Sequence, residues 1–136
     1  MIIPLLGVVE VAGIRAPGVP LFNAQPLSFP RGANVTFELR VKYSTGELID
    51  LTQAGLSLVF AVKQHTNDPV AVLSLGALVL PAKGRGYAEM YLDANTLLCF
   101  SPTKYVYDVW VLWPSGEKDS IVPLSPLFLA PGATFD

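Results

Sequence analysis

The stretch VTFELRVKY, residues 35–43, decides the fold class of this chain. Its apolar residues occupy every second position, and Thr, Glu, Arg and Lys stand between them. Because successive side chains of a β-strand point to opposite faces, this alternation predicts a strand with one face in the core and one in water. The run YVYDVWVLW, residues 105–113, is rich in aromatic and β-branched residues and predicts a second long strand.

Turn-forming residues divide the rest of the chain into short segments. Twelve prolines and eleven glycines are spread along it, and they leave no room for a long amphipathic helix. Further strands are expected within residues 56–65, 70–75, 78–80, 87–92 and 120–129, the last being an edge or bulged strand because it contains Pro123 and Pro126. Asp93 is expected to cap one helical turn. The pattern predicts an all-β antiparallel sandwich of about seven to eight strands.

Residues 1–32 have a different character from residues 33–136, which are expected to form the sandwich domain. Prolines at positions 4, 17, 20, 26 and 30 predict an extended, proline-rich N-terminal arm with room for one strand around residues 8–14. Two interpretations stay open: the arm crosses to a neighbouring subunit, or it packs on its own domain. The apolar start lacks the basic segment of a signal peptide and is interrupted far short of the roughly 20 apolar residues of a spanning helix. No membrane association is expected.

The composition points away from nucleic acid and toward protein partners. Hydrophobic residues make up 51% of the chain and charged residues 15%, against about 25% charged in average soluble proteins. A surface so poor in charge is either covered by a partner or tolerates exposed apolar residues, and exposed apolar patches usually mark interfaces. The net charge is −2 and no two basic residues are adjacent, so the clustered positive charge of a nucleic-acid site is missing from the sequence.

No residue pattern predicts catalysis, a metal site or a cofactor. His65, the single histidine, stands beside a turn with no nucleophile suggested for it, and is expected to be a surface residue. Cys99, the single cysteine, lies between Leu98 and Phe100, and an apolar setting makes a thiol unreactive. The aspartates are scattered singly rather than gathered in a calcium loop. The chain is therefore not expected to be an enzyme.

A protein interface is the site that the sequence does predict. The apolar residues of the arm and one tryptophan are its candidates: Ile2, Ile3, Leu5, Leu6, Leu21, Phe22 and Trp110. Trp110 is preferred to Trp113 because its strand face also carries Asp108, which makes that face less suited to the core. The alternative is a carbohydrate- or host-surface-binding module, for which Trp113 with Tyr91 or Tyr107 would have to form an exposed aromatic platform.

An ordered set of short motifs carries a family resemblance. It comprises LIDLTQA at 48–54, GYAEMYL at 86–92, KYVYDVWVL at 104–112 and PSG at 114–116. Over about residues 34–134 the chain resembles an immunoglobulin-like domain common in tailed-phage virion proteins, and is similar to the N-terminal domain of baseplate upper proteins. It departs from that pattern at Ile49, where proline is usual, and the first 30 residues have no counterpart.

The resemblance implies a structural protein of the virion. Capsid decoration, neck and tail or baseplate positions all fit. Such a protein would be a homo-oligomer that docks on other virion proteins, with no nucleic acid and no membrane as partner. Within the fold, the resemblance implies that Tyr105 is a tyrosine-corner residue whose hydroxyl reaches the backbone. It also implies that Asp108 is partly buried and hydrogen-bonded.

Overall fold

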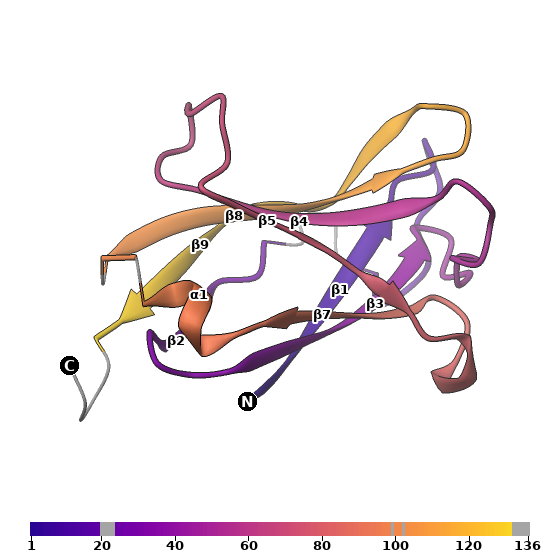
Figure 1. The fold of residues 1–136 in the computed structure, drawn as a ribbon. Coiled ribbons are helices and arrows are strands. Elements are labelled where there is room, and N and C mark those ends of the chain that lie inside the picture. The colour runs from indigo at the N-terminus through magenta and orange to yellow at the C-terminus, as the bar shows by residue number, and fades with distance from the viewer. Residues whose placement is uncertain (20–23, 99, 102, 132–136) are drawn as a thin grey trace.

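Two β-sheets pack face to face in the computed structural model, which describes residues 1–19, 24–98, 100–101 and 103–131 (Figure 1). Sheet I has the strand order β1 (Ile2–Val9), β3 (Val35–Tyr43), β7 (Tyr87–Leu92), β6 (Leu78–Val79). Sheet II has the order β2 (Leu27–Pro30), β9 (Lys118–Ala130), β8 (Lys104–Leu112), β4 (Ser57–Lys63), β5 (Leu73–Gly76). A 3₁₀ turn (Pro81–Lys83) and the short helix α1 (Ala94–Leu97) complete the described elements. The predicted all-β sandwich is confirmed.

The alternating strands place their apolar residues between the sheets. In β3, Val35, Phe37, Leu39 and Val41 are fully buried, while the residues between them face outward. Aromatic rings then connect the layers: Phe37 of sheet I stacks on Phe60 of sheet II at 4.9 Å between centroids, and Phe60 stacks on Tyr107 at 5.1 Å. Stacked aromatic pairs add to the stability gained from burying their area.

The prediction that the sheets are purely antiparallel is wrong. β1 runs parallel to β3, and β2 runs parallel to β9, whereas the other strand pairs of the described residues are antiparallel. Both parallel strands come from the first 32 residues and are added at sheet edges, next to strands that lie far away in the sequence. No hairpin turn connects such a pair, so turn signals could not have revealed its direction.

The N-terminal segment therefore packs on its own domain. It supplies two strands where the sequence predicted one around residues 8–14, and its buried side chains include Leu5, Val9, Leu27 and Phe29. Its prolines are compatible with strands because β1 and β2 both lie at edges, where a residue without an N–H group costs no ladder hydrogen bond. Whether the segment also contacts another subunit remains an expectation.

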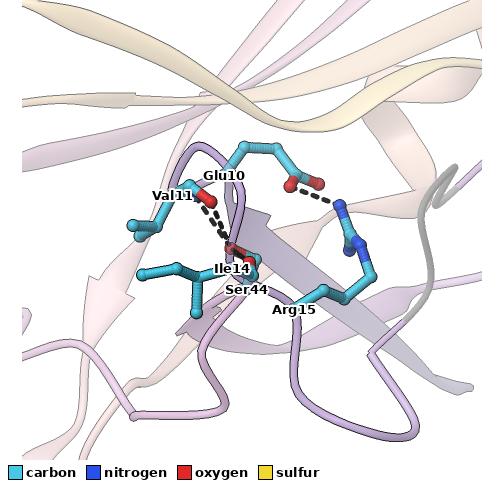
Figure 2. A network of polar contacts seen from close by, with 5 residues as sticks. All are labelled: Glu10, Val11, Ile14, Arg15 and Ser44. Carbon is cyan, nitrogen blue, oxygen red and sulfur yellow. Dashed lines mark hydrogen bonds and ion pairs between the residues drawn. The ribbon is translucent and has the colours of Figure 1, made fainter.

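Two polar contacts fasten the connection between β1 and β2. The first is the Ser44 hydroxyl, which accepts from the Val11 N–H at 2.8 Å and donates to the Ile14 carbonyl at 2.7 Å; Figure 2 shows it beside the Glu10–Arg15 ion pair. The second is the Gln25 carboxamide, which accepts from the Leu6 N–H and donates to the Leu6 carbonyl, both at 2.8 Å. Gln25 thus occupies the free edge of β1 as a neighbouring strand would.

Several local expectations are confirmed. Asp93 caps α1, since its carboxylate accepts from the Asn95 N–H at 2.9 Å. The Tyr105 hydroxyl donates to the Ser101 carbonyl at 2.9 Å, as a tyrosine-corner residue does. The pairing of β8 with β9 is bulged between Tyr107 and Trp110, although β9 itself lies inside sheet II. No helix among the described residues is long and apolar enough to cross a membrane.

Candidate protein-interaction surface

The outward face of sheet I carries polar groups that bond to one another. The Tyr87 hydroxyl lies 2.8 Å from a Glu38 carboxylate oxygen and 2.6 Å from a Glu89 oxygen, and Lys83 Nζ lies 2.9 Å from the same Glu89 oxygen. The Arg40 guanidinium covers the Tyr87 ring at 4.8 Å from its centroid. Hydrogen bonds from Tyr87 and then Lys83 hold the pKa of Glu89 below its ordinary value. These side chains form a polar network around the buried Tyr87, and each has a partner within it.

The outward face of sheet II carries a cluster of apolar side chains on β8 and β4. Since Tyr105, Tyr107, Val109 and Val111 of β8 are buried in the core, the alternate residues Val106, Asp108, Trp110 and Leu112 face outward. In β4 the outward residues include Val59 and Lys63, because Leu58, Phe60 and Val62 are the buried set. Trp110 and Leu112 are half-buried although nothing in the described chain packs over them as a third layer.

An open pocket of about 380 Å³ lies on this face. Its lining residues are Val59, Lys63, Trp110, Leu112 and Lys118, which we call the Trp110 surface. The register of the sheet brings them together: Val59 of β4 is opposite Trp110 of β8, and Leu112 of β8 is opposite Lys118 of β9. The pocket therefore has an apolar centre, with Lys63 toward one end of β8 and Lys118 toward the other.

Asp108 fixes the orientation of the tryptophan. The two side chains share a face of β8, and the indole Nε1–H of Trp110 donates to Asp108 Oδ2 at 2.8 Å. Asp108 is 4% exposed, and the other oxygen of its carboxylate, Oδ1, is buried with no hydrogen-bond partner within the described part of the chain. The expectation that Asp108 is hydrogen-bonded is confirmed, and its burial is more complete than expected.

Neither lysine of the Trp110 surface is engaged by a described residue. No carboxylate of the described residues lies within ion-pair distance of Lys63 or of Lys118, whereas Lys83 on sheet I is paired with Glu89. Their ammonium groups are therefore available to a partner. The sequence analysis missed both lysines, together with Val59 and Leu112, because only the pairing register places them beside Trp110.

The predicted interface residues do not form one surface. Ile2, 65% exposed, and the half-buried Leu6 face outward on sheet I, and Trp110 faces outward on sheet II. Leu5 is 3% exposed and Ile3 packs against the core, so Leu5 is corrected to a core residue. Its position in β1 turns it toward sheet II, since alternate residues of a strand face opposite ways. Leu21 and Phe22 lie outside the described residues.

The aromatic platform of a carbohydrate-binding module is not assembled. Tyr107 is completely buried in the core, and the Trp113 indole donates to Asp119 at 2.6 Å. Tyr91 is 57% exposed, but it lies near the end of β7 beside α1, whereas Trp113 follows β8 at the opposite end of the sandwich (Figure 1). These rings cannot stack on one sugar.

His65 is an exposed turn residue, as predicted. Its backbone N–H donates to the Asp68 carboxylate at 3.0 Å, which closes the turn after β4. Cys99 lies outside the described residues. In the described ranges, no three side chains of the histidine, cysteine, aspartate and glutamate types gather as a metal site would require.

Comparison with known proteins gives a match among solved structures alone. No family model matches the chain, and no curated protein sequence matches it. Among solved structures, the chain is similar to the N-terminal domain of phage TP901-1 ORF48, with 10% sequence identity and a TM-score of 0.49. The likeness covers 98% of this chain and 100% of that domain.

Proposed function

We propose that the chain is a non-catalytic structural subunit of a phage particle and that it docks on another virion protein through the Trp110 surface. The observation that carries the docking proposal is the Trp110 surface itself, an open pocket with an apolar centre on the outward face of sheet II and a lysine toward each end. Val59, Trp110 and Leu112 are half-buried there, beside two lysines that have no ion-pair partner among the described residues. A contiguous apolar patch with a polar rim is the usual form of a protein interface, and tryptophan often dominates its binding energy.

The assignment to a virion is supported by the sequence resemblance over residues 34–134. Two of its motifs have clear structural roles. In the first, the Asp50 carboxylate accepts from the Thr52 N–H at 3.0 Å and so fixes the corner after β3. In the second, Tyr105 forms its corner hydrogen bond with the Ser101 carbonyl. Capsid, neck and tail or baseplate positions, and assembly as a homo-oligomer, all remain within this proposal.

The test uses particles of the phage that encodes the chain. The photo-cross-linking amino acid benzoylphenylalanine replaces Trp110 in one variant and Tyr91 in a control variant. Tyr91 is a matched control because it is also aromatic, and it is exposed on the outward face of the other sheet. We expect the protein in purified particles at a fixed copy number, and cross-links to another virion protein from position 110 but not from position 91.

Two outcomes would contradict separate parts of the proposal. If mass spectrometry finds no copies of the chain in purified particles, the virion assignment is wrong. If the chain is present but position 91 cross-links as strongly as position 110, the Trp110 surface is not the docking site.

A further inference from the structure

We propose that the partner presents an acidic segment to the Trp110 surface, with one apolar side chain in the pocket and carboxylates beside Lys63 and Lys118. This inference rests on the proposed docking function and adds the chemistry of the partner to it. The occupant is a segment of another protein, because the pocket combines an apolar floor with two separate cations rather than a continuous basic track.

The floor of the pocket selects an apolar side chain. Val59 and Trp110 face each other across β4 and β8, and Leu112 is the next outward residue along β8. The Trp110 N–H is already donated to Asp108, so the indole offers a partner its apolar ring. A pocket of about 380 Å³ accommodates a side chain the size of leucine or phenylalanine together with part of its backbone.

The lysines select negative charge at the rim. Lys63 is paired in register with Val106 and Lys118 with Leu112, so the two lysines are six residues apart along β8. At about 3.3 Å per residue, their backbones are roughly 20 Å apart along the strand direction, with Trp110 between them. An extended segment with acids on both sides of an apolar residue matches this arrangement, and complementary charges would set its register.

Asp108 acts as a positioning residue and disfavours the wrong charge at the centre. Its carboxylate is buried beneath the surface and has one oxygen with no donor among the described residues. A second carboxylate entering the centre of the pocket would meet this charge at close range in a medium of low dielectric constant. Acids of the partner are therefore kept to the two lysines, and the centre is left to the apolar group.

The experiment uses a synthetic blocked nonapeptide with a single central leucine, aspartates on both sides and serine spacers. It is titrated into the full-length protein, labelled with ¹⁵N, at up to millimolar concentration. We expect saturable shifts of the Trp110 indole N–H signal and little change at the Trp113 indole. A second peptide, in which lysine replaces each aspartate, should not shift the Trp110 signal.

Reversing the charge of Lys63 and Lys118 tests whether they bind the aspartates of the peptide. The double variant Lys63→Glu/Lys118→Glu should bind the acidic peptide at least tenfold more weakly and should now bind the lysine peptide. The control variant Lys42→Glu/Arg85→Glu has the same net charge, but Lys42 belongs to β3 of sheet I and Arg85 lies just before β7, both outside the pocket lining, so its affinity should equal that of the wild-type protein.

The outcomes separate this inference from the proposed function. If the acidic peptide leaves the Trp110 signal unmoved, or binds both double variants equally, the inferred partner chemistry is wrong. It is also overturned if a sulfated oligosaccharide or a short DNA strand binds at Trp110 more tightly than the peptide. In either case, cross-links from position 110 in particles would still support docking at the Trp110 surface. If those cross-links were also absent, the docking part of the proposed function would be wrong as well.

Discussion

Asp108 determines how Trp110 is presented, and this can be tested through stability. Asp108→Ala would leave the half-buried indole N–H without its acceptor, and we expect the free energy of unfolding to fall by about 1–2 kcal/mol. Asp108→Asn should cost less, because its amide oxygen can still accept and the buried charge is removed. Urea denaturation followed by tryptophan fluorescence measures both. An alanine variant as stable as the wild-type protein would show that the bond contributes nothing.

Glu89 gives the outward face of sheet I a dependence on pH. Its pKa is lowered in the folded protein, first by the hydrogen bond from Tyr87 and then by that from Lys83. A lowered pKa means that the ionised form stabilises the fold. This contribution is present above the ordinary value of 4.5 and is lost as the pH falls through the lower folded value.

Glu89→Gln should therefore weaken the acid dependence of stability. We expect the melting temperature of the wild-type protein to fall as the pH drops below about 4.5, and that of the variant to fall less over the same range. Glu47→Gln is the control, since Glu47 is an exposed turn residue. Thermal melts by circular dichroism between pH 3 and pH 7 measure the effect, and identical acid slopes for wild type and Glu89→Gln would contradict it.

At the scale of elements, the exposed edge of β1 is closed by a side chain rather than by a strand. Gln25 makes two hydrogen bonds to the Leu6 backbone, and its own backbone is bonded to Ser125 and Tyr107 of sheet II. The residue thus connects the edges of the two sheets. Pro4, which has no N–H, protects the same strand against pairing with another chain.

Gln25→Ala should loosen this edge. Two lost hydrogen bonds predict a decrease of about 1–3 kcal/mol in the free energy of unfolding, and the Leu6 amide should exchange its hydrogen faster than neighbouring core amides. Hydrogen exchange followed by NMR measures this, with Gln64→Ala as the control because Gln64 is exposed after β4. Unchanged protection of the Leu6 amide would show that the carboxamide does not hold the strand.

At the scale of the whole molecule, the N-terminal segment is part of the sandwich. Deleting residues 1–30 would remove β1 and β2, and with them the core side chains of Leu5, Val9, Leu27 and Phe29. Each large apolar side chain lost from a core typically costs about 2–5 kcal/mol of stability. The summed cost of these four side chains exceeds the free energy of unfolding of most domains of this size. We expect the truncated chain to be unfolded by circular dichroism; a cooperative thermal transition would instead show that residues 31–136 form an independent domain.

The two outward faces also belong to this scale. The core between the sheets stabilises the fold, so the outward-facing side chains of sheet I and sheet II can differ in chemistry. On sheet I, Tyr87 lies within hydrogen-bond distance of Glu38 and Glu89, and Lys83 pairs with Glu89; on sheet II, Trp110 is half-buried and no described residue forms a third layer over it. A single layer of partner protein on sheet II would complete its burial.

The sequence alone determined the fold class and much of the local structure. The alternation in β3 and β7 identified these strands and their buried faces, because the two-residue period of a strand is a local property. The aromatic and β-branched residues of β8 identified that strand. The cap at Asp93 and the turn around His65 and Asp68 were likewise readable, since each depends on a few adjacent residues.

Only the tertiary structure decided how distant segments meet. The parallel direction of β1 and β2 has no local signal, because each pairs with a strand far away in the sequence. The Trp110 surface depends in the same way on the register of β4, β8 and β9, which brings Lys63 and Lys118 to the ends of one pocket. Strand register is fixed by the packing of the whole core, and a shift of one residue would turn Trp110 inward and Val111 outward.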